Sequence, residues 1–162
     1  MTVEELMELK RKADAIAEIE KTVVKEANRY NLLLENLKQI LKFFKDTLIN
    51  TDVGRSIRFF LTEERDRYTY VGIHENGEFY IDLPGCSAID INESNFIKAV
   101  TYKNETGRFI RRDFVLLADN WVRIKEEFLQ GIKEEFSERI KCSQKNIASM
   151  TEDYITAKEF QV

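Results

Sequence analysis

Apolar side chains recur at every seventh position through the first 50 residues, and this long stripe limits what the chain can fold into. Seven residues make nearly two turns of an α-helix, so residues spaced in this way share one helix face. Three such rows lie side by side: Leu9, Ile16, Val23, Tyr30, Leu37 and Phe44; Ile19, Leu33 and Ile40; and Leu6, Ala13, Ala27, Leu34, Leu41 and Leu48. The pattern predicts a helix over residues 1–50 with an apolar face wider than a two-stranded zipper needs.

Local signals mark both ends of this helix. Thr2-Val3-Glu4-Glu5 has the capping-box pattern, in which Thr2 and Glu5 each satisfy the other's backbone N–H group. The polar run Asn50–Gly54 predicts the stop. A second helix is predicted over residues 119–160, with Asp119 as its N-cap. Its apolar residues follow at intervals that keep them on one side: Val122, Leu129, Ile132, Phe136, Ile140, Ile147, Met150 and Tyr154.

Between these helices, residues 55–114 contain short runs rich in β-branched and aromatic residues, which predict an antiparallel β-meander of five to six strands. The predicted strands are Ile57–Thr62, Arg67–His74, Glu78–Leu83, Asn95–Lys103 and Arg108–Phe114, with a weaker one at Ser87–Ile91. A hairpin is also predicted at Asn104–Gly107. We therefore expect an α+β fold in one domain, residues 1–162, with both helices packed on one sheet face and with each other or a second chain.

The dipeptide Asn76-Gly77 is the strongest turn signal in the chain. Asn-Gly between strand-like runs favours a two-residue type I′ hairpin, because both turn positions need positive φ. In that hairpin Glu75 faces Glu78, and Ile73 faces Tyr80. The predicted core face then carries Tyr68, Tyr70, Gly72, His74, Phe79, Ile81 and Leu83, and the opposite face carries Thr69, Val71, Ile73, Tyr80 and Asp82.

The predicted helices are longer than the predicted sheet can cover. A helix over residues 2–49 is roughly 70 Å long, whereas five strands span about 20 Å by 25 Å. Either the two helices pair beyond the sheet, or they pack against a second chain. The width of the stripe favours a bundle and hence a homo-oligomer, a dimer or larger. The predicted oligomer face comprises Ile16, Val23, Tyr30, Leu37, Phe44, Ile140, Ile147 and Tyr154.

Few residues in the sequence are typical of catalysis. His74 is the single histidine, and Cys86 and Cys142 belong to no metal-ligand spacing. No phosphate-binding loop, nucleophile elbow or zinc motif is present, so we expect no catalytic residue, no metal and no cofactor. An enzyme that uses Cys86 or His74 is the least favoured reading.

Arginine and aromatic residues are interleaved in the predicted meander, and they form the best candidate for a partner-binding surface. The candidates are Arg58, Tyr80, Tyr102, Arg108, Arg111 and Arg112. Tyr and Arg are enriched at protein hot spots, which favours a protein partner and a non-catalytic interaction module such as an assembly factor, inhibitor or adaptor. The alternative is a reader of single-stranded nucleic acid or nucleotides by stacking and phosphate pairing. The net charge of −4 disfavours this alternative.

The sequence also carries signals about location and source. Met1–Lys12 alternates charged and apolar residues, unlike a secretory leader, and no run approaches the length needed to span a bilayer. These features predict a cytoplasmic protein with no membrane partner. Frequent Ile, Lys, Asn, Phe and Tyr, with one Pro and six Gly, are typical of AT-rich bacterial or phage genes.

Overall fold

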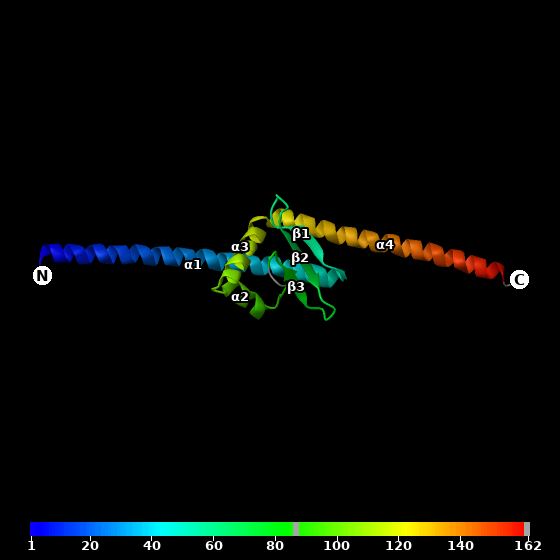
Figure 1. Cartoon of the computed structure of the whole chain (residues 1–162), viewed down its shortest axis with the longest axis horizontal. Helices are drawn as coiled ribbons and strands as arrows, with labels where there is room; N and C mark the ends of the chain where they lie inside the picture. The colour runs from blue at the N-terminus through cyan, green and yellow to red at the C-terminus, as the bar shows by residue number, and fades with distance from the viewer. Residues whose placement is uncertain (86–87, 161–162) are drawn as a thin grey trace. The chain divides into compact units, whose positions relative to one another are not determined.

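The computed structural model describes residues 1–85 and 88–160, and the chain divides into two compact units, residues 1–42 and 43–162. The first unit is helical from residue 3 onward, as part of α1 (Val3–Thr51). The second contains the end of α1, a four-stranded sheet and three further helices (Figure 1). This composition confirms the α+β class and the two long helices. Cys86 and Ser87, which include the start of the weaker predicted strand, lie outside the described residues.

The predicted start of α1 is confirmed in atomic detail. The Thr2 backbone N donates to Glu5 Oε2 at 2.7 Å, and the Glu5 backbone N donates to Thr2 Oγ1 at 3.3 Å. This reciprocal pair satisfies two N–H groups that the helix leaves free. The helix ends at Thr51, inside the predicted stop, where Asp52 turns into the left-handed region with a φ of 49°.

The sheet is antiparallel with four strands in the order β1 (Ile57–Phe60), β2 (Tyr68–Ile73), β3 (Phe79–Asp82) and β4 (Ile89–Asp90). Alternate residues of β1 and β2 are buried, as the period of two along a strand requires. The free edge of β1 is covered by α4 (Trp121–Glu159): Glu127 Oε2 accepts from the Phe60 backbone N, and Arg123 donates to the Phe60 carbonyl. These bonds take the place of a neighbouring strand.

The predicted hairpin register is wrong by one residue. The structure pairs Ile73 with Phe79 and Val71 with Ile81. The turn is one residue longer than a type I′ turn: the His74 backbone N donates to the Glu78 carbonyl, and Gly77 adopts a φ of 83°. This geometry is that of a three-residue loop closed by a glycine bulge. A slip of one residue moves a whole strand to the other face, so Thr69 and Val71 are buried and Tyr68 and Tyr70 are exposed.

The last two predicted strands are also wrong, because both segments are helical. Asn95–Lys103 lies largely in α2 (Glu93–Thr101), and Arg108–Phe114 lies in α3 (Glu105–Asp119). Asn104, placed in a hairpin turn by the sequence, instead caps α3, its side chain accepting from the Gly107 backbone N at 2.9 Å. The buried residues of α3 follow helical spacing: Gly107, Ile110, Asp113, Phe114 and Leu117.

One aromatic cluster forms the centre of the second unit. Phe44, near the end of α1, stacks on Phe59 of β1 with ring centroids 5.5 Å apart, and meets Phe128 of α4 edge-on at 4.7 Å. Trp121 approaches Phe44 edge-on at 5.3 Å. The end of α1 and the first half of α4 therefore cover one sheet face (Figure 1), and Tyr68 and Tyr70 on the other face are exposed.

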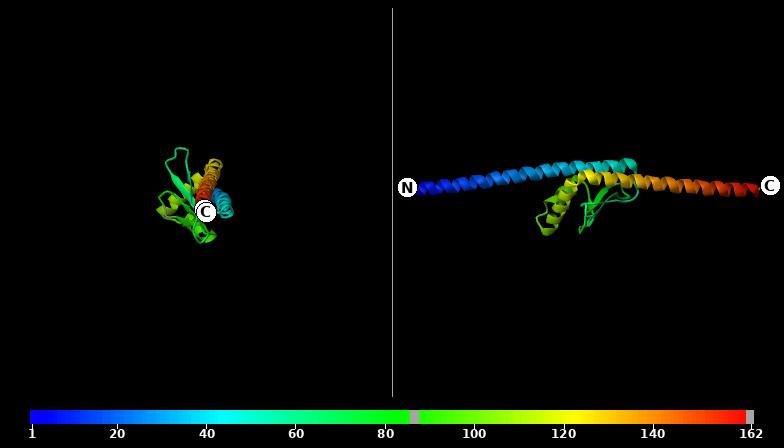
Figure 2. Two further views of the ribbon diagram at one scale, coloured as in Figure 1. Left: turned by 90° about the vertical axis from the view of Figure 1, so that its right-hand side faces the viewer. Right: turned by 90° about the horizontal axis from the view of Figure 1, so that it is seen from above.

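The helix α4 begins one residue later than predicted, with Asn120 rather than Asp119 at the N-cap. Gly131 lets it approach the sheet closely, because a Cβ atom there would lie 2.6 Å from Ile57 Cγ2. Beyond this contact α4 continues without interruption past the sheet (Figure 2). Among residues 1–85 and 88–160, no helix combines the length and the apolar content that crossing a membrane would require.

Candidate interaction surfaces

The apolar stripe of the first unit lies largely in solvent. The exposed fraction of the side chain is 57% for Ile16 and 61% for Val23, and Tyr30 is half-buried. Leu37 and Phe44, from the same predicted row, are buried. The predicted oligomer face of α1 is thus exposed at Ile16 and Val23 and buried at Leu37 and Phe44. The exposed large apolar residues of this unit are Met1, Val3, Leu6, Met7, Leu9, Ile16, Ile19, Val23, Val24 and Leu32.

A second exposed stripe follows the far half of α4. Ile140, Ile147 and Tyr154, all predicted for the oligomer face, have exposed fractions of 56%, 63% and 65%. Phe136 lies one turn before Ile140 and Met150 lies between Ile147 and Tyr154; both are on the same side of the helix and are also exposed. Every described residue from Ile140 onward is exposed. Among residues 43–85 and 88–160 of the second unit, nothing therefore covers this stripe.

The outer face of the sheet gathers aromatic and cationic side chains. Arg58 faces Tyr70 across the strands, and its guanidinium lies over the Tyr68 ring, 5.1 Å from the centroid. The rings of Phe60 and Tyr68 are 4.4 Å apart, and Arg65 lies 5.3 Å from the Phe60 centroid. This outer sheet face is defined by Arg58, Phe60, Tyr68, Tyr70 and Tyr80, and it is partly solvated, because Tyr68 and Tyr70 are exposed.

Tyr80 is the most constrained member of this outer sheet face. It lies across Gly72, where a Cβ atom would approach the Tyr80 hydroxyl to 2.6 Å, and that hydroxyl bonds to Ser56 Oγ. The His74 ring stacks on Tyr80 with centroids 4.4 Å apart, and His74 Nε2 bonds to Asp90 Oδ1 at 2.7 Å. Burial, with a smaller effect of Asp82, raises the pKa of Tyr80. The hydroxyl thus keeps its proton to a higher pH than a free tyrosine, and the stacked His74 ring restricts movement of the Tyr80 ring.

Of the remaining predicted partner residues, Tyr102 follows the end of α2, and Arg108, Arg111 and Arg112 lie on α3. Arg111 donates to the carbonyl oxygens of Val100 and Tyr102, so it ties the end of α2 to α3. Arg112 lies over the Phe109 ring and 3.5 Å from Asp113. Arg108 is exposed. Among these residues, Arg108, Arg112 and Tyr102 are available to a partner, while Arg111 is engaged in holding the fold.

Two polar features of the second unit could not be located from the sequence. Asp113 is completely buried, and its Oδ1 accepts from Arg67 Nη1 at 3.0 Å. Burial raises the pKa of Asp113, and the nearby Arg112 and Arg67 only partly offset this effect. In the α1–β1 loop, Arg55 pairs with Glu135 and Glu138 of α4, and these carboxylates raise the pKa of Arg55. Both pairs join segments far apart in sequence.

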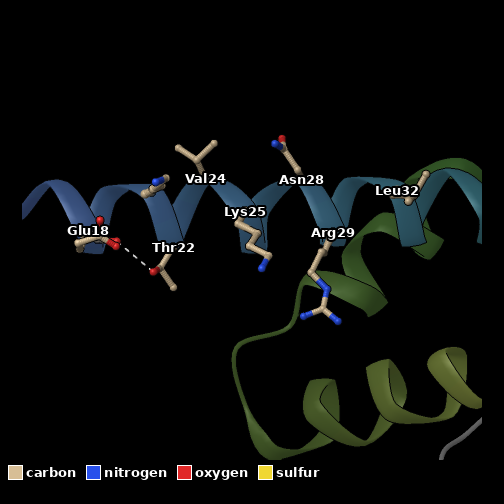
Figure 3. A pocket seen from close by; sticks show the side chains of 8 residues that line it. Glu18, Thr22, Val24, Lys25, Asn28, Arg29 and Leu32 are labelled. Atoms are coloured by element: carbon tan, nitrogen blue, oxygen red, sulfur yellow. Dashed lines mark hydrogen bonds between the residues drawn. The ribbon is translucent and has the colours of Figure 1, made fainter.

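One surface hollow lies on the first long helix. It is lined only by residues of α1 between Glu18 and Leu32, where Val24 and Asn28 point to one side of the helix and Lys25 and Arg29 to the other (Figure 3). Since all its walls come from one helix, it is a feature of the helix surface rather than an enclosed cavity. Within the described part of the chain, no three His, Cys, Asp or Glu side chains cluster as metal ligands would. Cys142 is exposed on α4.

No protein-family model, curated protein or solved structure matches this chain. The candidate surfaces are therefore interpreted from their geometry and chemistry.

Proposed function

We propose that this protein is a non-catalytic interaction module, an assembly factor, inhibitor or adaptor, that self-associates through its long helices. The observation that carries the proposal is the pair of exposed apolar stripes, on residues 3–32 of α1 and residues 136–157 of α4. Water contact costs roughly 25 cal/mol per Å² of apolar surface, and contiguous exposed apolar patches of this kind mark interaction sites. A second copy of the same chain supplies a matching apolar surface most simply.

The outer sheet face is the proposed contact for a protein target. The Tyr68 ring already lies between the Arg58 guanidinium and the Phe60 ring, so little side-chain freedom is lost there when a partner binds. Tyr80 in particular is fixed by Ser56, Gly72 and His74. Rigid aromatic anchors of this kind contribute large contact area at low entropic cost.

Self-association can be tested directly by producing two copies of the chain with different affinity tags in the same cells. We expect purification through one tag to recover the other tag in a comparable amount. Two separately purified samples that are mixed and equilibrated should exchange partners in the same way. Recovery of only the selected tag at micromolar concentration would contradict the proposal.

Binding of single-stranded nucleic acid is the alternative function, and the stacked Arg58–Tyr68 and Arg65–Phe60 pairs are the observation that favours it. This alternative predicts oligonucleotide affinity that falls steeply with salt and is reduced at least about tenfold by Arg58→Ala with Tyr68→Ala. The exposed Arg29→Ala on α1 is the matched control and should leave affinity unchanged. Fluorescence anisotropy at two salt concentrations measures the affinity of each variant and its salt dependence. Absence of binding at low salt would remove this function.

A further inference from the structure

The far half of α4 carries a regular seam, in contrast to the broad stripe of α1. Phe136, Ile140, Ser143, Ile147, Met150, Tyr154 and Ala157 follow alternating spacings of four and three. This is the a/d repeat of a coiled coil, sustained over three heptads, with Ile140, Ile147 and Tyr154 at a positions. In that register every large apolar residue from Phe136 to Ile155 falls on the seam, with the single exception of Ile155.

The seam lies away from the face that α4 presents to the core. The buried residues of α4 are Ile124, Phe128, Ile132 and Glu135. Their mean direction is roughly 75° from that of the seam at the 3.6 residues per turn of a straight helix, and roughly 130° at the 3.5 residues per turn of a coiled coil. Val122 and Leu129, which continue the d row beside the sheet, are exposed. A helix docked on the seam would therefore leave the packing of the second unit intact.

The first part of α4 sets where the seam can begin. The a positions there are Glu126 and Lys133, which would face their own copies across a symmetric pair and repel. From Phe136 to Ala157, neither the a positions nor the d positions carry a charged residue. The structure thus limits the seam to residues 136–157, beyond the contact of α4 with β1.

Ser143 distinguishes between possible registers of a pair. In a parallel, in-register pair every seam residue meets its own copy, so Ser143 meets Ser143, and the β-branched Ile140 and Ile147 occupy a positions as two-stranded coils prefer. In the antiparallel arrangement with the longest overlap, Ser143 would face Ile147 and lose its hydrogen-bonding partner. Polar-with-polar pairing therefore favours the parallel register.

The charges beside the seam also favour the parallel arrangement. Asp153 at g and Lys158 at e lie within reach of each other between parallel chains, twice by symmetry. The Lys158 ammonium already lies over the Tyr154 ring, 5.9 Å from its centroid, and within the described residues neither Asp153 nor Lys158 has an ion-pair partner. In an antiparallel pair, Asp153 would instead form its ion pair with Arg139 of the other chain. Arg139 already contacts Glu135 and the Asp52 carbonyl.

The stripe of α1 is a poorer candidate for the same arrangement. Its d row contains Lys12 and Glu26, so a parallel, in-register pair of α1 helices would place each of these charges against its own copy. The seam of α4 contains no charged residue between Phe136 and Ala157. Of the two stripes, α4 therefore fits a parallel pair better.

We infer that residues 136–157 of α4 form a parallel, in-register, two-stranded coiled coil with the same residues of a second copy. This inference rests on the proposed self-association and names the element, the orientation and the register through which it occurs. Each chain brings the full seam, and the two second units are joined at the point where α4 leaves the sheet.

Single cysteines at seam and flanking positions test the inference in the full-length chain with Cys86→Ser and Cys142→Ser. Ser143→Cys places a thiol at a d position, where it meets its own copy only in the parallel register. Asn146→Cys, at a g position, meets its own copy only in the antiparallel arrangement. Lys145→Cys, at an f position on the outside, is the matched control for random collision.

Under mild oxidation we expect more than half of the Ser143→Cys chains to become covalent dimers, with Asn146→Cys and Lys145→Cys near background. Light scattering of the same samples under reducing conditions should give the mass of a dimer. Cross-linking at Asn146 instead, a dimer with no cross-link at Ser143, or a trimer would overturn the inference and leave self-association standing. A monomer would overturn both.

Discussion

Ile147→Lys is expected to raise the dissociation constant of the self-associated protein at least about 100-fold. Ile147 is 63% exposed in the single chain and lies at the centre of the α4 seam. Burial of such a side chain contributes about 1.5–3 kcal/mol, and a symmetric pair loses it twice. The two ammonium groups would also face each other. Since each 1.4 kcal/mol is tenfold in affinity, the loss of two isoleucine contacts alone accounts for about two orders of magnitude.

The matched control is Ile155→Lys. Ile155 is the same residue type on the same helix and is 52% exposed, but it lies at a b position outside the seam. We expect its dissociation constant to stay within about threefold of the parent value, because surface substitutions of this kind change free energies by up to about 0.5 kcal/mol. Sedimentation velocity over a concentration series compares the two. Equal weakening by both substitutions would contradict the seam as the contact.

Arg67→Met is expected to lower the free energy of unfolding by about 3 kcal/mol. Arg67 donates to Asp113, which is completely buried, and removal of one partner leaves a charge in the interior with too few compensating bonds. The exposed Arg108→Met, also an arginine of the second unit, is the control and should change stability little. Urea unfolding at one fixed protein concentration measures both, because self-association makes stability depend on concentration.

The stability that Arg67→Met loses depends on pH in a predictable direction. Burial raises the pKa of Asp113 in the folded chain above its unfolded value, so the folded chain holds that proton more tightly. Stability from this group is therefore present at low pH and falls as pH rises through the folded pKa. Without Arg67 the folded pKa rises further. The deficit of Arg67→Met should thus be largest at neutral pH and shrink at mildly acidic pH; a deficit that grows on acidification would contradict this account.

The long helices could be predicted because their signals are local and repeated. A heptad row needs only the 3.6-residue period to be recognised, and the Thr2–Glu5 capping box forms as its spacing predicts. The three strands from Ile57 to Asp82 were likewise marked by β-branched and aromatic runs. In both cases several residues indicate the same type of element, so one atypical position does not change the prediction.

The errors arose where one residue decides between two structures. At the hairpin, the bulge at Gly77 adds a residue to the turn and exchanges the faces of β2. The type I′ turn predicts Tyr68 and Tyr70 in the core, whereas the structure has them on the surface. In α2 and α3, aromatic and β-branched residues suggested strands. The spacing of Phe96, Ala99 and Val100, and of Ile110, Phe114 and Leu117, could have revealed helices, but the buried Asp113 interrupts the apolar pattern.

The candidate surfaces were predictable in part for the same reason. Ile16, Val23, Ile140, Ile147 and Tyr154 follow from helical spacing and are exposed. Arg111 was proposed as a partner residue because its charge was visible in the sequence, whereas its bonds to the Val100 and Tyr102 carbonyls depend on how α2 meets α3. The stacking of Arg58 on Tyr68 depends on the strand register. Tertiary contacts of this kind leave no periodic signal.

The mass of the intact chain in solution tests the central claim most directly. Multi-angle light scattering across a series from low to high micromolar concentration, without tags, should give twice the mass of one 19.1 kDa chain over most of the series. Ile147→Lys in the same series should give the mass of one chain over a wider range of concentration. A parent chain that keeps the mass of a monomer at high micromolar concentration would contradict the account.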